Sequence, residues 1–210
     1  MACGSRYLLF NFNLILMTHR YQKLRDNALT RLREELPDNL KYHNYEHTYR
    51  MLELVNEYVA PYSFTANEVE LLQIAILFHD MGFLLNAKNH EFESSHIAQN
   101  ALKELDFSED EIRLVKSLII ATRLPQEPEN DLERIICDID LDYLGRKNYF
   151  EISETLYEEW LLLGIIKDRK EWKQKELNFL KNHQYHSIVG IQERQPMLNK
   201  NLEKILSSRT

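Results

Sequence analysis

Apolar residues recur at three- and four-residue spacing along nearly the whole chain, which is typical of amphipathic helices that each bury one face. Pro37 ends the first such stretch, and Asn44, Asn67 and Ser108 are suitable N-caps for the second, third and fifth. We therefore expect an all-α fold. The predicted helices cover residues 20–36, 45–59, 68–80, 90–105, 109–122, 131–144, 152–166, 170–183 and 187–206.

The third predicted helix differs from the others in its pattern. Residues 69–78 are almost all apolar and leave hardly any polar face. A helix that is apolar all round is buried. This helix is therefore predicted to be the central rod of a compact bundle.

The composition agrees with one helical domain. The chain of 210 residues has only 5 glycines and 5 prolines, which disfavours a loop-rich β fold. Apolar residues make up 44% and charged residues 28%, as in ordinary globular proteins with one core. We expect a single domain over residues 20–206, after an N-terminal extension over residues 1–19 that is disordered or forms an extra helix. Its apolar stretch could form a surface through which the protein associates as a homo-oligomer. Met17 is an alternative first residue of the protein.

The net charge and the two cysteines indicate which kinds of binding partner and which cell compartment to expect. A net charge of −7 argues against a nucleic-acid platform, which needs clustered Lys and Arg. A small anionic substrate remains compatible, because a bound cation can reverse the local sign. No apolar run reaches the ~20 residues of a membrane span. Cys3 and Cys137 do not suggest a structural disulfide, so we expect a cytoplasmic protein in which Cys137 is a core side chain rather than a nucleophile.

The predicted central helix ends in His79 and Asp80. A carboxylate there meets the negative end of the helix dipole and loses hydration. It therefore needs a positive partner. That partner is either a Lys or Arg side chain, or a bound cation with His79 as a second ligand.

A second histidine points toward the same interior. His47, Met51, Leu54 and Tyr58 share one stripe of the second predicted helix. A lone inward histidine is more often a core residue than a ligand. Two inward histidines together with acids on buried helices favour the ligand interpretation.

Three carboxylates follow one another in the sixth predicted helix. Asp140 falls between the apolar positions Ile136 and Leu144, whereas Asp138 and Asp142 share a polar arc. Asp140 is therefore predicted to face the core. Asp138 and Asp142 are predicted to be solvated surface charges.

The residues above carry a family resemblance. The segments 42–48, 78–82 and 138–141 resemble the H…HD…D signature of HD-domain metal-dependent phosphohydrolases, and in particular small bacterial proteins described as predicted HD phosphohydrolases. The likeness extends over roughly residues 20–205. It implies an all-α HD fold and a metal held by His47, His79, Asp80 and Asp140. Asp138 can also be aligned with the last position, and the helical wheel favours Asp140.

The chemistry of this donor set agrees with the resemblance. Two imidazoles and two carboxylates suit one divalent ion of Mn, Fe, Co, Ni, Zn or Mg, and the absence of thiolates disfavours a structural zinc site. Such an ion lowers the pKa of a water toward ~7 and polarises a phosphoryl oxygen. We expect hydrolysis of a phosphomonoester or phosphodiester, from a nucleotide or another small phosphorylated compound, with Asp80 at the catalytic centre.

Residues 86–91 follow the His-Asp pair and offer further groups. His90 or Glu91 is predicted to donate the proton to the leaving oxygen, and Lys88 to contact the phosphate. Arg123 is a further candidate phosphate contact. The alternative for Glu91 is an ordinary role in stabilising the start of a helix.

Two more histidines and two other functions bear on this interpretation. His96 should point away from His90, which favours one metal over two, and His43 is predicted to be structural or exposed. An iron-dependent oxygenase would need more inward ligands. A metal-stabilised regulatory or scaffold domain without turnover is the alternative outside enzymes.

Overall fold

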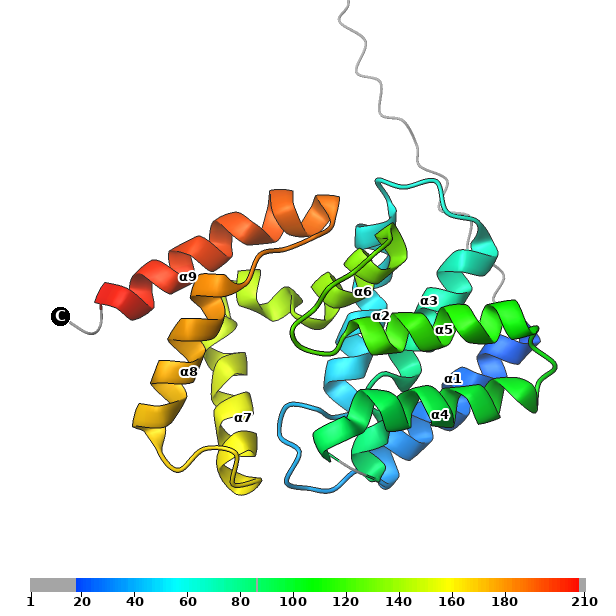
Figure 1. Cartoon of the computed structure of the whole chain (residues 1–210), viewed down its shortest axis with the longest axis horizontal. Coiled ribbons are helices and arrows are strands. Elements are labelled where there is room, and N and C mark those ends of the chain that lie inside the picture. Colours follow the sequence, from blue (N-terminus) through cyan, green and yellow to red (C-terminus); the bar gives the residue numbers. More distant parts are fainter. Residues whose placement is uncertain (1–17, 86, 208–210) are drawn as a thin grey trace, which may run out of the picture.

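The computed structural model describes residues 18–85 and 87–207 (Figure 1). Within these ranges the chain is built from helices and contains no strand, which confirms the predicted all-α fold. Its α-helices are α1 (His19–Glu34), α2 (Tyr45–Val59), α3 (Ala66–Phe78), α4 (His90–Lys103), α5 (Glu109–Ala121), α6 (Asp131–Asp140), α7 (Tyr149–Leu162), α8 (Arg169–Asn182) and α9 (Gln195–Ser207). The shorter helical elements are η1 (Met81–Leu84), η2 (Ala87–Asn89), η3 (Asp142–Gly145) and the π-helical η4 (Gly190–Arg194).

The start of α3 corrects one predicted cap. Asn67 was expected to cap this helix, but the N-cap is Thr65. The Thr65 hydroxyl accepts a hydrogen bond from the Glu68 backbone N–H, and the Glu68 carboxylate accepts one from the Thr65 N–H (2.8 Å). This reciprocal capping box satisfies two orphan donors at once, which a lone Asn67 would not do.

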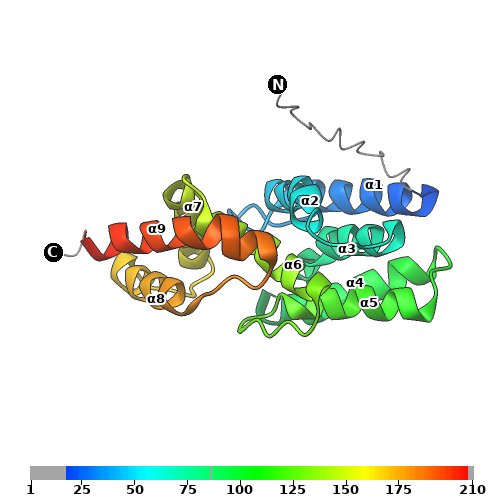
Figure 2. The ribbon, with the colours of Figure 1, turned by 90° about the horizontal axis from the view of Figure 1, so that it is seen from above.

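The buried helix α3 is the centre of the larger half of the molecule. It contacts α1, α2, α4, α5 and α6, which surround it in Figures 1 and 2. Its residues from Val69 to Phe78 are buried apart from the partly buried Gln73. The predicted central rod is therefore confirmed.

The apolar core consists of two clusters. The larger cluster surrounds α3, and the smaller cluster joins η3 to α7, α8 and α9 through residues such as Leu144, Tyr149, Leu180 and Leu198. In both ribbon views α7–α9 lie beside the group α1–α5, with α6 between them (Figures 1 and 2). The candidate site lies where the two groups of helices meet.

Two predicted helices change their helix type within the predicted range, whereas the others differ from the observed bounds by at most four residues at an end. The helix expected over residues 131–144 stops at Asp140 and continues as η3. The helix expected over residues 187–206 contains the π-helical η4 near its start, and Gly190, the first residue of η4, lies against Asp138. A Cβ atom at Gly190 would be 2.1 Å from Asp138 Oδ2, so only glycine allows this close approach.

The predicted N-terminal extension lies mostly outside the described residues, as does the alternative start at Met17. The described part begins at Thr18, whose side chain caps α1 by accepting a hydrogen bond from the Tyr21 N–H (3.1 Å). Among the described residues, no helix combines the length and apolar character needed to cross a membrane.

Candidate metal centre

Three helix ends converge at the junction of the two groups and carry the four predicted ligands. His47 lies in the first turn of α2, His79 caps the C-terminus of α3, Asp80 follows it, and Asp140 ends α6. Asn44 caps α2 by accepting a hydrogen bond from the His47 N–H (3.1 Å), so the cap also sets the position of His47. Both carboxylates thus lie at helix C-termini, where the dipole favours a cation.

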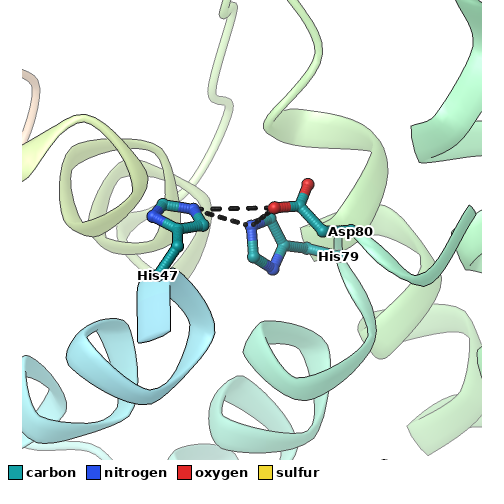
Figure 3. Close-up of side chains that lie close together, drawn as sticks. All are labelled: His47, His79 and Asp80. Atoms are coloured by element: carbon teal, nitrogen blue, oxygen red, sulfur yellow. Dashed lines mark hydrogen bonds and ion pairs between the residues drawn. The ribbon is translucent and has the colours of Figure 1, made fainter. Parts of the chain in front are cut away.

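The donor atoms of these residues are close together. His47 Nε2 is 3.3 Å from His79 Nε2 and 3.6 Å from Asp80 Oδ2, and His79 Nε2 is 3.0 Å from Asp80 Oδ2 (Figure 3). The three side chains form a buried cluster that could hold a metal ion. Asp140 Oδ1 lies beside it, 3.1 Å from His47 Nε2 and 3.7 Å from His79 Nε2.

These separations fit ligands of one ion. Donors at about 2.1 Å from a common metal are about 3.0 Å apart in adjacent octahedral positions and about 3.4 Å apart in tetrahedral ones. The measured distances run from 3.0 to 3.7 Å. His47, His79 and Asp80 would therefore need only small movements to coordinate an ion, and Asp140 Oδ1 lies beside the two histidines of this group.

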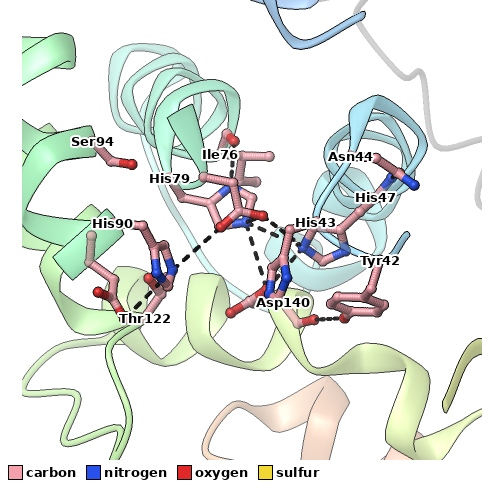
Figure 4. A network of polar contacts seen from close by, with 12 residues as sticks. Tyr42, His43, Asn44, His47, Ile76, His79, His90, Ser94, Thr122 and Asp140 are labelled. Carbon is pink, nitrogen blue, oxygen red and sulfur yellow. Dashed lines mark hydrogen bonds and ion pairs between the residues drawn. The ribbon is translucent and has the colours of Figure 1, made fainter. Parts of the chain in front are cut away.

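The polar atoms of the cluster also fit a cation. Asp80 Oδ2 is buried without a hydrogen bond and faces the Nε2 atoms of His79 (3.0 Å) and His47 (3.6 Å), so the carboxylate needs positive charge there, from a protonated histidine or from a cation bound by both rings. His79 Nδ1 lies 2.8 Å from the Ile76 carbonyl oxygen, to which it donates (Figure 4). This bond leaves the Nε2 lone pair of His79 directed at the cluster, which is the arrangement of a metal-binding histidine.

The electrostatics of the cluster favour added positive charge. Burial lowers the pKa of His47 and keeps its imidazole neutral, as a metal ligand requires. Burial disfavours a charged His79, but Asp80 and Asp140 outweigh it and raise the pKa of His79 to about 9. Burial likewise opposes ionisation of Asp80, yet the neighbouring His79 and His43 lower the pKa of Asp80 well below its usual range. A divalent ion would take the place of the proton on His79.

His90 and Glu91 lie at the edge of the cluster. His90 Nε2 is 3.7 Å from Asp80 Oδ1 and 3.6 Å from Glu91 Oε1, and both residues line the adjoining cavity. Gly82 makes this possible, because a Cβ atom there would be 1.9 Å from the His90 carbonyl oxygen. The Gly82 N–H also donates to Ser94 Oγ (2.7 Å), which holds η1 against α4. Of the two predicted proton donors, His90 thus lies beside Asp80, and Glu91 lies beside His90.

The two predicted phosphate contacts, Lys88 and Arg123, are not among the residues that line the cavity beside the cluster. Lys88 is exposed in η2, and Arg123 is exposed after α5. Arg123 lines a separate hollow with Ile120, Leu124 and Pro125. Contact of either basic side chain with a substrate stays a prediction.

His43 is a site residue that the sequence interpretation missed. Its Nδ1 forms a short ion pair with the buried carboxylate of Glu159 on α7, which also accepts hydrogen bonds from the backbone N–H groups of Tyr42 (2.8 Å) and His43 (3.0 Å). The His43 ring stacks on Phe83 and lies 6.1 Å from the His47 ring (Figure 4). His43 was expected to be structural or exposed; its bond to Glu159 is a structural contact, and its ring also lines the cavity, which the sequence did not indicate.

The charges of this pair follow from their contact. Burial opposes protonation of His43, but Asp80 and Glu159 outweigh it and raise the pKa of His43. Burial opposes ionisation of Glu159, but its bond to His43 lowers the pKa of Glu159. The only sequence signal was the position of His43 four residues before His47, since Glu159 is 116 residues away.

Asp138 and Asp142 are not solvated, which corrects the prediction for both. Asp138 has 0% of its surface exposed and accepts hydrogen bonds from the backbone of His186 and from both the N–H and hydroxyl of Ser187. Asp142 is 5% exposed and accepts a hydrogen bond from Arg194 Nε (2.5 Å). The segment before α9 covers this arc of α6 and η3, and the helical wheel could not reveal it. Cys137 is a buried core residue as predicted, and burial raises the pKa of its thiol.

A cavity of about 370 Å³ opens onto the cluster. The polar end of its wall includes Asp80, Asp140, His43 and His90, and the remainder is formed largely by η3, α7 and α8. A cavity of this size can hold a small molecule. The candidate metal centre is therefore accessible to a ligand.

Comparisons with known proteins give a family and a fold. A family model described as "HD domain" matches residues 44–142, a range that contains His47, His79, Asp80 and Asp140. A solved structure from Lactobacillus plantarum, determined as a structural genomics target, superimposes with a TM-score of 0.63 over 92% of this chain and 99% of that one. The identity is 12%, so this likeness shows the fold alone. No curated protein matches the chain.

Proposed function

This chain belongs to the HD-domain superfamily, and on that premise we propose that it hydrolyses a phosphoester with one divalent metal ion held by His47, His79, Asp80 and Asp140. The substrate is a nucleotide or another small phosphorylated compound. One observation carries the proposal. Donor atoms of His47, His79 and Asp80 lie 3.0–3.6 Å apart beside a cavity, Asp140 Oδ1 lies 3.1 and 3.7 Å from the two histidines, and Asp80 Oδ2 is buried there without a hydrogen bond.

When bound, a divalent ion acts as a Lewis acid toward the phosphoryl group and makes a water nucleophilic near neutral pH. The protein side chains provide orientation. His47 and His79 offer Nε2 lone pairs, and the hydrogen bond from His79 Nδ1 to the Ile76 carbonyl (2.8 Å) fixes the ring. Asp80 and Asp140 offer carboxylate oxygens on the cavity wall.

Hydrolysis adds hydroxide to phosphorus and a proton to the leaving alcohol oxygen. We assign the proton to the pair formed by His90 and Glu91, whose side chains are 3.6 Å apart and line the cavity. Asp80 Oδ1, 3.7 Å from His90 Nε2, would keep that imidazole oriented. The alternative of a plain helix-start role for Glu91 is compatible with the same contacts.

The pair of His43 and Glu159 fits a second supporting role. Glu159 occupies His43 Nδ1, so the remaining nitrogen, Nε2, is free to donate to a phosphoryl oxygen in the cavity. Glu159 itself would act as a positioning residue. Lys88 and Arg123 stay predicted phosphate contacts.

A loaded-protein assay tests the proposal. Protein saturated in turn with Mn²⁺, Ni²⁺ and Fe²⁺ is incubated with phosphomonoesters and phosphodiesters, and released phosphate or alcohol is measured. We expect turnover that His79→Ala and Asp80→Ala abolish. His96→Ala is the matched control, because this histidine is exposed on α4 and should not affect turnover.

Two results would replace the proposal. Oxygen consumption with Fe²⁺ and no ester hydrolysis would make the protein an iron-dependent oxygenase. A metal-dependent rise in melting temperature without turnover of any compound would make it a regulatory or scaffold domain.

A further inference from the structure

The cavity beside the metal centre has two chemically different ends. Metal-site residues Asp80 and Asp140 belong to the first end. The second end lies between α7 and α8, where the wall contains the side chains of Leu156, Trp160 and Trp172. The two indole rings meet edge to face with centroids 5.4 Å apart. A ligand bound at the metal would thus extend its remaining atoms along an apolar wall.

Three hydroxyl groups of the cavity wall, those of Tyr149, Ser153 and Thr122, are already partnered. The Tyr149 hydroxyl and Ser153 Oγ both donate to Glu176 Oε1, at 2.7 and 2.6 Å. The Thr122 hydroxyl donates to the Ile119 carbonyl oxygen at 2.8 Å. A sugar or polyol could use these three hydroxyl groups only by breaking their bonds, and much of the remaining wall between α7 and α8 is apolar, so its burial would be costly.

The charge of the wall disfavours several phosphates. Lys175 is the one Lys or Arg among the described residues that line this cavity, and it is half-exposed and paired with Glu171 at 3.7 Å. Carboxylates on the same wall include Asp80, Asp140 and Glu176. A diphosphate or triphosphate needs several cationic donors, and apart from Lys175 this wall offers only His43, which is paired with Glu159, and His90, both at the metal end. One phosphoryl group, bound at the metal, is what the charges allow.

We propose that the substrate is a phosphate ester with a single phosphoryl group and an apolar alcohol part, whose carbon skeleton lies between α7 and α8. This inference rests on the proposed phosphohydrolase function. The apolar wall then acts as the specificity determinant, because burying each methylene favours binding about fourfold.

Tryptophan fluorescence can report binding independently of any turnover, because the only two tryptophans of the chain, Trp160 and Trp172, both line the cavity. Hexyl phosphate and glycerol 1-phosphate are titrated into Zn²⁺-loaded protein while tryptophan emission is recorded. We expect hexyl phosphate to saturate the change at a concentration at least about tenfold lower. Equal or tighter binding of glycerol 1-phosphate, or of a nucleoside monophosphate, would overturn the inference.

A pair of variants on α7 tests the wall itself. Leu156→Asn places an amide on the cavity wall, and Leu161→Asn makes the same change at a residue that is 41% exposed. Leu156 is only partly buried, and melting temperatures check that both variants fold. We expect Leu156→Asn to weaken hexyl phosphate binding about tenfold and to leave binding of inorganic phosphate unchanged. Leu161→Asn should match the parent protein, and equal effects of the two variants would refute the inference.

Turnover of the same esters separates the two proposals. If hexyl phosphate binds in a Leu156-dependent manner but no ester is hydrolysed, the phosphohydrolase function fails while the apolar site stands. If glycerol 1-phosphate is hydrolysed as well as hexyl phosphate and Leu156→Asn changes neither, the apolar substrate class fails while the hydrolase function stands.

Discussion

Asp138 and Asp140 are two residues apart on α6 and should respond to the same substitution in opposite ways. Asp138 is buried behind the helix and accepts hydrogen bonds from His186 and Ser187. Asp140 faces the metal centre with its Oδ1 3.1 Å from His47 Nε2. Replacement of each by Asn therefore tests which carboxylate serves the fold and which serves the metal.

The expected cost at Asp138 follows from its contacts. In Asp138→Asn the amide oxygen can take the place of Oδ2 and still accept from Ser187, but the amide N–H₂ then takes the place of Oδ1, 2.9 Å from the His186 nitrogen, where two donors face each other. An unsatisfied buried donor costs about 1–3 kcal/mol. Burial raises the pKa of Asp138 even though Ser187 and His186 oppose this, so removing its charge recovers part of the cost. We expect the free energy of unfolding to fall by about 1–3 kcal/mol, and by about 2–5 kcal/mol for Asp138→Ala, which strands the N–H groups of both His186 and Ser187.

The substitution Asp140→Asn is expected to lower the affinity for the metal ion. Its side chain is 16% exposed and lies near the like charge of Asp80, so Asp140→Asn should change the free energy of unfolding of the metal-free protein by less than about 1 kcal/mol. Loss of an outer-sphere partner already weakens metal binding about 10–100-fold. Loss of a direct ligand should weaken it by about 100-fold or more.

Urea denaturation of metal-free protein and calorimetric titration with Mn²⁺ or Zn²⁺ measure the two quantities separately. Asp138→Asn should lower stability and retain metal affinity, and Asp140→Asn should do the reverse. If Asp138→Asn weakened metal binding as much as Asp140→Asn, the choice of Asp140 as ligand would be wrong. Unchanged stability of Asp138→Asn would show that its buried hydrogen bonds contribute nothing.

Three further outcomes are expected. Glu159→Gln breaks a buried ion pair with His43 and should destabilise the protein by about 2–4 kcal/mol. Because the pKa of Glu159 is lowered and that of His43 is raised, the pair contributes fully to the free energy of unfolding between the ordinary pKa values of 4.5 and 6.5. This contribution is lost as the pH falls through the folded pKa of Glu159 or rises through the folded pKa of His43. Denaturation of both proteins at pH 3, 5.5 and 9 checks this, and a stability difference independent of pH would contradict it. Burial, reinforced by His186, lowers the pKa of His183 from 6.5 to about 4, so the stability associated with its neutral form is present above pH 6.5 and is lost as the pH falls toward 4. Between pH 6.5 and pH 4 the free energy of unfolding of His183→Gln should therefore fall by about 1–3 kcal/mol less than that of the parent protein. An NMR titration in which His183 has an ordinary pKa would disprove this explanation. Divalent metal at 100 times its dissociation constant should stabilise the protein by about 2.7 kcal/mol, seen as a rise in melting temperature that a chelator reverses, and the same rise in His79→Ala would argue against this site.

The amino-acid sequence by itself determined the helices and the residues that face inward. The period of apolar positions identified α2 within its observed bounds and marked α3 as the buried rod, because helical geometry places residues three and four apart on one face. The same helical geometry predicted that Asp140 faces the interior, and it predicted the same for His47, which lies on the apolar stripe of α2. These properties depend on neighbours within one or two turns, so the linear pattern contains them.

The tertiary structure decided what covers each face and which distant groups meet. Asp138 and Asp142 looked solvated on the wheel of α6, but the segment before α9 and the η4 turn bury them. His43 looked peripheral until α7 brought Glu159 to it from 116 residues away. The apolar wall between α7 and α8 arises in the same way. Hydrogen bonds and cavities of this kind join residues whose separation in the chain has no fixed period, so no local pattern of apolar and polar positions records them.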